Sequence, residues 1–434
     1  MSVIVGDVFT TGDILLPGGD VRLEAWSVIA CDQFSSEPEY WERVRSVADG
    51  KPSTLNMIIP EAYLEDIDED SEIEAISRCM AEYLESGVLR EIKDSFVYVE
   101  RTLPDGRLRR GLVGIADLEE YEFAGGDAAI LASEGTTLDR LPPRIRVREK
   151  ASLELPHIIA FIADKAGTVI EPLSQKANRL PLLYDFELME GGGHLKGMRI
   201  SGSDAHEVMA ALRALHGEGL QTGASRRLMI MGDGNHSLAA AKTYWDDLKQ
   251  GLSAAERESH PARRALLEVN NVYDPAISFE AIHRVIFDVD AGEFMDAFGI
   301  AMQAASEKQA AKDEGTGSEY ALKLLSLDIP HSTLNVQDII VSASCIGDMI
   351  AAVQEFIDEY LSRAGGRLDY IHGTAAVENL AAGKGCVGII LPAMEKSEFF
   401  DTVASRGVFP RKAFSVGHAR DKRYYMECRK IGHF

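Results

Sequence analysis

The chain has 434 residues, of which 46% are hydrophobic and 26% are charged, so it is long enough to bury a core and is not expected to be disordered. Its formal net charge of −24 would repel nucleic acids and anionic membrane surfaces. The five cysteines lack metal-ligand spacing, the first residues lack the basic start of a signal peptide, and no apolar run would span a bilayer. These features predict a cytoplasmic protein with no nucleic-acid or membrane partner, and they leave a homo-oligomer open.

In the first 200 residues, strand and loop patterns predominate. The first 60 residues alternate short apolar runs with turns, and apolar residues at three- to four-residue spacing then predict a helix within 61–92. Hairpins are predicted in 94–118, around Pro-Asp-Gly, and in 181–200, around three glycines. The alternating arginines of 144–148 predict an edge strand whose charged face is either solvated or held against an anion.

The rest of the chain alternates helices and strands. A helix over 203–220 precedes a strand, a turn and a helix over 226–245, and further helices are predicted over 253–268 and 278–287. The polar segment 304–318 has the composition of a linker. Beyond it, a strand over 320–327 and a helix over 346–363 indicate a small lobe, and the basic run 406–430 predicts a closing hairpin. The predicted fold is α+β, with a main domain over 1–303, a linker over 304–318 and a smaller C-terminal α/β lobe over 319–434.

The most informative motif is Gly-Asp-Gly-Asn-His-Ser at 232–237, between an apolar run and an alanine-rich helix. The first amide groups of a helix lack intrahelical acceptors and carry partial positive charge, and glycines let a ligand approach the backbone. Asp233 would act as a base or hold a metal, and His236 would contact a phosphoryl oxygen. A plain surface turn is the alternative interpretation, because Asp-Gly is common in turns. The residues expected to bind phosphate here are Gly232, Gly234, Asn235 and Ser237.

Other candidate residues lie at the ends of apolar runs or in basic segments. Asp32 and Gln33 end one such run, where binding residues often occur. His283 and Arg284 lie inside an apolar segment, which is typical of a structural histidine and also compatible with a ligand contact. Arg411 and Lys412 belong to the basic C-terminal run, for which structural and ligand-binding roles are equally open.

These segments resemble the bacterial and archaeal family of domain of unknown function 1015. Its members carry a strand, an Asp-Gly-His/Asn-His turn and a helix, then a His-Arg-Val segment and a C-terminal Phe-Pro-x-Lys block. Here these are 232–237, 283–285 and 409–412. Where many relatives have arginine, this chain has Ser237, so phosphate binding would depend more on backbone N–H groups and on arginines elsewhere. Glu134 is kept from a further stretch of the relatives, whose histidine is lost here.

The turn is also similar to the phosphate-binding turn of the ParB/sulfiredoxin-like superfamily, which includes DNA-partition switches, a sulfinic-acid reductase and free-serine kinases. The net charge disfavours the DNA-binding branch, and no cysteine has the reactive context of the reductase. The resemblance therefore implies a mixed-sheet ParB/sulfiredoxin-like core and ATP or ADP with Mg²⁺ as cofactor.

The function expected from the sequence is phosphoryl transfer from a nucleotide or phosphorylated metabolite to a small hydroxylated acceptor such as serine. A non-catalytic nucleotide- or metabolite-binding regulator and a phosphatase-type hydrolase are the alternatives. Gln33 would contact the acceptor, and no side chain is assigned as a dedicated metal ligand. The expected catalytic residues are Asp233, His236, Asp32 and Glu134. The expected cofactor-binding residues are Gly232, Gly234, Asn235, Ser237, His283, Arg284, Arg411 and Lys412.

Overall fold

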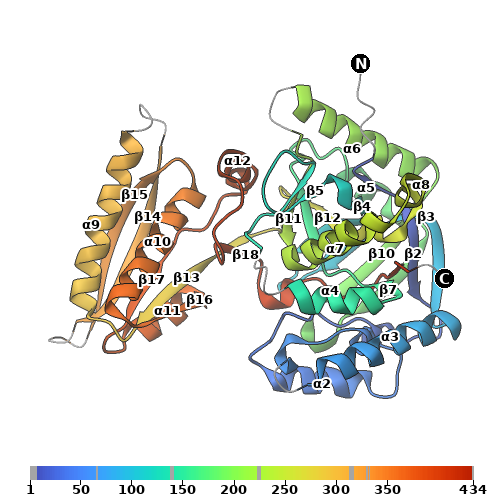
Figure 1. Cartoon of the computed structure of the whole chain (residues 1–434), viewed down its shortest axis with the longest axis horizontal. Coiled ribbons are helices and arrows are strands. Elements are labelled where there is room, and N and C mark those ends of the chain that lie inside the picture. Colours follow the sequence, from blue (N-terminus) through green and yellow to red (C-terminus); the bar gives the residue numbers. More distant parts are fainter. Residues whose placement is uncertain are drawn as a thin grey trace. The chain divides into compact units, whose positions relative to one another are not determined.

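A computed structural model describes residues 7–64, 67–136, 141–221, 226–311, 317–328, 331 and 333–432 of the chain. The contacts divide the chain into two units. Figure 1 colours the chain by residue number, so the residues of each unit can be found from its colour bar. Unit 1 comprises Met1–Ala132, Thr136–Ile277 and His418–Phe434, and unit 2 comprises Ser133–Gly135 and Ser278–Gly417. The chain therefore enters unit 2 briefly at 133–135, forms the rest of it after residue 277 and returns to unit 1 at residue 418.

The division differs from the boundary expected at 304–318. Helix α9 (Ala291–Ala310) extends into the start of that segment, and residues 312–316 lie outside the described residues. Strand β13 (Phe279–Phe287), expected as a helix, pairs with three strands of unit 2. Because its hydrogen bonds tie β13 to those strands, the boundary falls just ahead of it.

Unit 1 is built on a large mixed sheet, whose order along its main path is β5-β6-β11-β8-β12-β4-β3-β10-β9. Within the described residues, β6 pairs in parallel with β5 and β11, and β8 with β12; the remaining pairs of this sheet are antiparallel. Strands β1 and β2 add to β4 and β3. The strands are β1 (Phe9–Thr10), β2 (Gly12–Pro17), β3 (Leu89–Thr102), β4 (Leu108–Asp117), β5 (Tyr121–Glu122), β6 (Ile130–Leu131), β8 (Ile159–Ile162), β9 (Leu182–Glu187), β10 (His194–Ile200), β11 (Met229–Asp233) and β12 (Arg264–Asn271).

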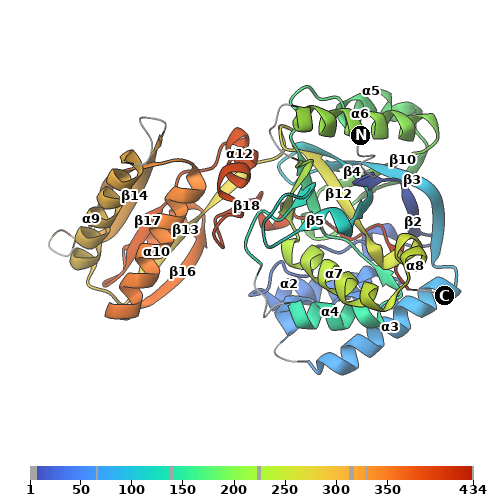
Figure 2. The ribbon, with the colours of Figure 1, turned by 45° about the horizontal axis from the view of Figure 1, so that its top comes forward.

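Helices lie on both faces of this sheet. Figure 2 shows α5 and α6 on one side and α7, α4, α3 and α2 on the other. The helices are α1 (Leu23–Trp26), α2 (Pro38–Ala48), α3 (Glu69–Glu85), α4 (Leu141–Lys150), α5 (Glu171–Lys176), α6 (Ser203–Gln221), α7 (Asn235–Leu248) and α8 (Ala254–Ser259). Both predicted hairpins are confirmed as β3–β4 and β9–β10, and the predicted strand, turn and helix are confirmed as β11 and α7.

Two predictions for unit 1 are wrong. The segment 144–148 lies in α4, not in an edge strand, because two prolines in the first turn start a helix that places Arg144 and Arg148 on one face. The helix expected over 253–268 ends early at α8, and β12 follows. Seven of the eight residues of β12 are buried, as expected for a central strand that is covered on both faces. Its sequence therefore lacks the alternation of apolar and polar residues by which a strand is recognised.

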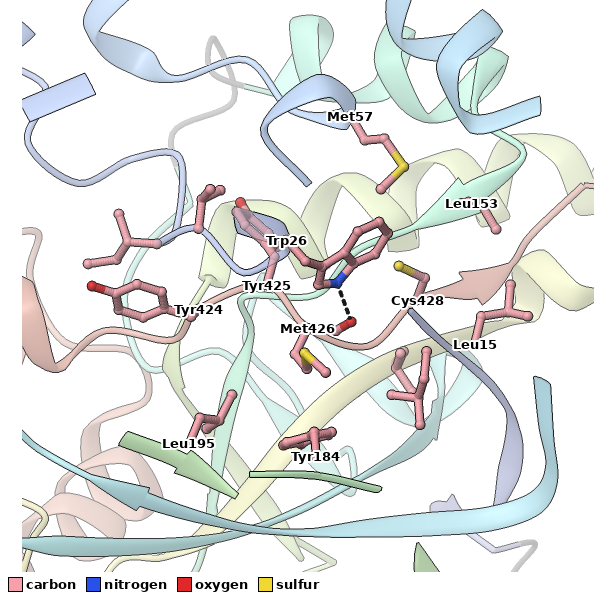
Figure 3. Packing of buried hydrophobic residues seen from close by; sticks show 14 of the residues in the cluster. Leu15, Trp26, Met57, Leu153, Tyr184, Leu195, Tyr424, Tyr425, Met426 and Cys428 are labelled. Carbon is pink, nitrogen blue, oxygen red and sulfur yellow. Dashed lines mark hydrogen bonds between the residues drawn. The ribbon is translucent and has the colours of Figure 1, made fainter. Parts of the chain in front are cut away.

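The core of unit 1 is completed by the end of the chain (Figure 3). The indole Nε1–H of Trp26 donates to the Met426 carbonyl at 3.0 Å, and the Ser27 hydroxyl donates to the Tyr425 carbonyl at 2.7 Å. Tyr424, Tyr425, Met426 and Cys428 are buried in the same apolar cluster as Trp26. Beyond them, β19 (Arg429–Lys430) pairs with β7 (Leu153–Glu154). The C-terminal segment is thus an internal element of unit 1.

Unit 2 contains a second sheet, ordered β15-β14-β17-β13-β16, to which β18 adds at the start of β13. All of its described pairs are antiparallel. Its strands besides β13 are β14 (Ser318–Asp328), β15 (Thr333–Ala343), β16 (Arg367–His372), β17 (Val387–Ile390) and β18 (Phe414–Val416), and its helices besides α9 are α10 (Ile346–Ala364), α11 (Thr374–Ala381) and α12 (Lys396–Arg406). The hairpin expected over 406–430 is wrong, because β18 pairs with β13 in unit 2 while β19 pairs with β7 in unit 1.

The fold class is therefore α+β, with one large mixed sheet and a second sheet. In the described part of the chain, every helix is too short or too polar to cross a bilayer.

Candidate functional site

The turn between β11 and α7 is held close to β8 by its two glycines. A Cβ on Gly232 would lie 2.3 Å from a ring carbon of Phe161, and one on Gly234 would lie 3.1 Å from the Cα of Ile158. Gly234 is also the N-cap of α7 and has a φ of 78°, in the left-handed region that glycine tolerates best. Both glycines are therefore required by the packing of the turn, whether or not a ligand approaches it.

Asp233, at the end of β11, forms an ion pair with a lysine from the far end of the chain. Its Oδ1 accepts the Gly234 N–H at 2.9 Å, and its Oδ2 lies 3.2 Å from the Nζ of Lys422. The two side chains are only 17% and 11% exposed, so the pair is poorly screened by water.

Ser237, in the first turn of α7, begins a chain of polar contacts into the core. Its Oγ lies 3.2 Å from the Nε2 of His157, and the Nδ1 of the same ring lies 3.0 Å from the Tyr425 hydroxyl. The Tyr425 hydroxyl also accepts the N–H of Cys31 at 3.2 Å. His157 and Tyr425 are buried, so both ring nitrogens of the histidine have their partners within the protein.

Asp32 lies within electrostatic reach of this network. The amide Nε2 of Gln33 donates to its Oδ1 at 3.0 Å. Burial by itself raises the pKa of the Asp32 carboxyl, but the charge of His157, the hydrogen bond from Gln33 and the charge of Lys422 together lower that pKa below its ordinary value. Asp32 is therefore held in the ionised form, and Lys422 interacts with both Asp32 and Asp233.

A cavity of about 200 Å³ adjoins the network. Ser237, His157 and Tyr425 supply part of its wall, and most of the rest is aliphatic, from α3, α4, the segment 57–59 and the strand start at Ile158. Arg144 and Arg148 of α4 also line it, each paired with a glutamate: Arg144 with Glu61 and Arg148 with Glu154. The cavity is thus mainly apolar, with Ser237, His157 and Tyr425 as one group of polar residues and the arginine–glutamate pairs as another.

The other predicted residues of the turn lie at its start and on α7. Gly232 is in β11, and Asn235 and His236 are the first two residues of α7; all three are partly exposed. Asp32 and the turn residues thus lie in the same unit and share two neighbours, His157 and Lys422.

The remaining predicted residues belong to unit 2. His283 and Arg284 follow one another on β13, and both are buried. The Leu391 N–H donates to the Nδ1 of His283 at 3.2 Å, and burial together with the charge of Arg284 lowers the pKa of His283. Each of these residues has structural partners in its own unit.

Arg284 is completely buried in unit 2. Its guanidinium donates to the Ile282 carbonyl, lies 3.4 Å from the Gln354 Oε1 and stacks 5.1 Å from the centroid of the Tyr370 ring. Burial lowers the pKa of Arg284 to about 10. These contacts are sufficient to explain an arginine on this strand.

Glu134, Arg411 and Lys412 are closer to the surface of unit 2. Glu134 is partly exposed and forms a parallel bridge with Phe409, while Arg411 and Lys412 are exposed. Of the predicted cationic residues, these two have side chains that a ligand could reach from solvent.

Three residues of this network were not predicted as site residues: Lys422, His157 and Tyr425. His157 lies 80 residues before Ser237 in the chain, and Lys422 and Tyr425 are farther from it still. No local motif marks them, and only the fold brings them together. Among the described residues, no three His, Cys, Asp or Glu side chains are clustered so as to hold a metal ion.

The family model described as protein of unknown function (DUF1015) matches residues 15–336, which is more than half of the chain. The chain belongs to this family. The match includes the 232–237 turn, Asp32 and His157, and it ends before Lys422 and Tyr425.

Several solved structures are distantly similar to this member of the family. A conserved hypothetical protein from Pyrococcus furiosus is 11% identical with a TM-score of 0.34, covering 73% of this chain and 94% of that one. A free serine kinase in complex with AMP is 11% identical with a TM-score of 0.37, and the match covers 73% of this chain and 91% of the kinase chain. SbnI with a C-terminal truncation, from Staphylococcus aureus, is 9% identical with a TM-score of 0.33, and the match covers 70% of this chain and 82% of the SbnI chain. No curated protein matches the chain. Similarity this low says nothing of substrate, so function has to follow from the site.

Proposed function

We propose that the protein is a small-molecule phosphotransferase that binds the phosphates of ATP or ADP at the 232–237 turn. The observation that carries the proposal is the position of the Asp233–Lys422 ion pair, 3.2 Å between Oδ2 and Nζ, at the N-terminus of a 14-residue helix. A helix N-terminus attracts anions, and a neighbouring ammonium group adds charge that a phosphate would share. We further propose that the core of unit 1 is of the ParB/sulfiredoxin-like type.

Phosphoryl transfer depends mainly on positioning and on neutralising charge. In this proposal the amide groups of the first turn of α7 and Lys422 bind the phosphates, and His236 contacts the transferred group. Asp32, which is ionised, accepts the proton of the acceptor hydroxyl, and Gln33 beside it contacts the acceptor. A serine-like amino acid fits this arrangement, because its hydroxyl is the group to be activated.

The residues present suit Mg²⁺ bound mainly through the nucleotide. Mg²⁺ in such sites keeps several waters and takes one or two carboxylates plus phosphate oxygens. Asp233 and Asp32 would supply those carboxylates, and the ion would neutralise phosphate charge when bound. His283, Arg284, Glu134, Arg411 and Lys412 belong to unit 2 and are given no part in this proposal.

The test is nucleotide titration by calorimetry, followed by a radiolabelled phosphoryl-transfer screen over serine, other hydroxylated amino acids and polyols. Lys422→Met should weaken nucleotide binding, and Asp32→Asn should lower turnover by roughly 10²–10³. The matched control is Lys430→Met, which removes a 45%-exposed lysine of the same C-terminal segment.

The outcomes separate the possible functions. Parent protein that binds neither ATP nor ADP contradicts the proposal. Binding without turnover would favour a regulator, and release of phosphate without an acceptor would favour a hydrolase.

A further inference from the structure

A serine, a histidine and a tyrosine are aligned on the wall of the cavity in unit 1. The Oγ of Ser237 is 3.2 Å from the Nε2 of His157, and the Nδ1 of that ring is 3.0 Å from the Tyr425 hydroxyl. His157 is 7% exposed and Tyr425 is 2% exposed, so neither contact competes with bulk water. A hydroxyl, a base and a third group that orients the base are the parts of an activated nucleophile.

The partners of both ring nitrogens are compatible with the tautomer that a base requires. The Tyr425 hydroxyl oxygen accepts the Cys31 N–H at 3.2 Å. Burial raises the pKa of the Cys31 thiol to about 12 and that of Tyr425 well above its ordinary value, so both groups stay neutral. In the tautomer that the proposed reaction requires, Nδ1 carries the proton and donates to the Tyr425 oxygen, and Nε2 accepts from the Ser237 hydroxyl.

The surroundings of the serine suit an acyl group. Ser237 lies in the first turn of α7, where backbone N–H groups lack intrahelical acceptors and a developing oxyanion would be stabilised. The adjoining cavity of about 200 Å³ is lined mainly by aliphatic side chains, including Met57, Ile73 and Val147. The Asp32 carboxylate interacts electrostatically with His157.

We propose that Ser237 is the nucleophile of an esterase activity, with His157 as general base and Tyr425 as the positioning residue, acting on esters with an apolar acyl group that occupies the cavity. This activity goes beyond phosphoryl transfer and does not require a nucleotide.

The reaction balances with water as the only co-substrate. The Ser237 oxygen bonds to the ester carbonyl carbon while its proton passes to the Nε2 of His157. The bond from that carbon to the alcohol oxygen then breaks, and His157 returns the proton to the departing alcohol. Water, deprotonated by His157, next attacks the acyl-serine; the carboxylic acid leaves, and the proton returns to Ser237.

The direct test is covalent labelling of the full-length protein by an alkyl fluorophosphonate, with the site identified by peptide mass spectrometry, and hydrolysis of p-nitrophenyl esters of increasing acyl length. We expect the label on Ser237, no label on Ser237→Ala, and a loss of at least roughly 10²-fold in hydrolysis for His157→Gln. Ser203→Ala removes an exposed serine from the first turn of α6 and should change neither measurement.

Two further variants separate catalysis from structure. Tyr425→Phe should lower kcat with little change in KM, because the acyl site is intact and only the orientation of His157 is lost. Val147→Phe should fill the cavity and raise KM for long acyl chains more than for acetate. A parent protein that is not labelled, or a Ser237→Ala variant that is labelled as fast as the parent, would overturn the proposal. Neither result depends on nucleotide binding, so the proposed phosphotransferase stands or falls separately.

Discussion

The ion pair between Asp233 and Lys422 should stabilise unit 1 measurably. At 3.2 Å and an effective dielectric constant of about 20, the Coulomb attraction is ~5 kcal/mol. Desolvation of the two charges offsets a large part of this, because the side chains are only 17% and 11% exposed. We therefore expect Lys422→Met, which leaves the carboxylate without its partner, to lower the free energy of unfolding by about 2 kcal/mol.

Asp233→Asn tests the same contact from the other side. The asparagine oxygen can still accept the Gly234 N–H that the carboxylate Oδ1 accepts at 2.9 Å, so the turn is preserved and only the charge is lost. If the ion pair is the cause, the double variant should lose less than the sum of the single losses, with a coupling energy of about 1–2 kcal/mol.

Urea unfolding followed by tryptophan fluorescence is well suited to the measurement. The three tryptophans of the chain, Trp26, Trp41 and Trp245, are all fully buried in unit 1, so the signal reports on this unit. Single losses within about 0.5 kcal/mol of zero, or losses that add without coupling, would refute the reasoning, because residues on an ordinary surface turn behave in that way.

Three further predictions concern the same unit. Gly234→Ala should lower the free energy of unfolding by about 2 kcal/mol, because it places a Cβ at a φ of 78° and 3.1 Å from the Ile158 Cα. The control is Gly251→Ala at an exposed glycine, which should change the free energy of unfolding little in the same urea titration. The pKa of Asp32 is lowered in the folded protein, so its charge should stabilise the fold above about pH 4, the pKa of the unfolded chain, and this contribution should be lost as the pH falls through the folded pKa. The unfolding free energies of the parent and of Asp32→Asn should therefore differ at pH 7 and converge below pH 4. A difference that stays constant with pH would contradict this. Glu268→Gln should lower the free energy of unfolding by about 3–5 kcal/mol, because Glu268 is 3% exposed, accepts a hydrogen bond from the Nε of Arg423 at 2.8 Å and lies 4.0 Å from the Nε of Arg109. A melting temperature equal to that of the parent would show that other groups neutralise these two arginines.

The parts of the fold that follow from local signals were predictable. The turn at 232–237 combines an apolar run, glycine and a helix start within a few residues, and the structure has β11 and α7 there. The β3–β4 hairpin follows from Pro-Asp-Gly between two apolar runs in the same way. Such signals need no knowledge of the rest of the chain.

The errors arise where periodicity is ambiguous. In 144–148, arginines at every second residue resemble one face of a strand, but two prolines ahead of them begin a helix. In β12 and β13, nearly every residue is buried or partly buried, so these strands lack alternation and resemble buried helices.

The site was predictable only in part, for a different reason. Asp233, Ser237 and Asp32 lie next to recognisable turns, whereas the groups that set their charge and hydrogen bonding come from distant segments. Lys422 and Tyr425 are contributed by the last residues of the chain, and their contacts to Asp233 and His157 depend on how the whole of unit 1 folds.

The return of the chain into unit 1 also affects the order of events during synthesis. Unit 1 begins near the N-terminus, yet the carbonyl that Trp26 binds belongs to Met426. A ribosome that has translated all of unit 2 still holds an N-terminal unit without the tyrosines that fill its centre, because Tyr424 and Tyr425 have yet to emerge. The enclosed unit 2 can complete its own sheet first, since the strands of that sheet all precede residue 418. Loss of residues 424–430, by a premature stop codon or by proteolysis, would therefore damage the unit that begins at the opposite end of the chain.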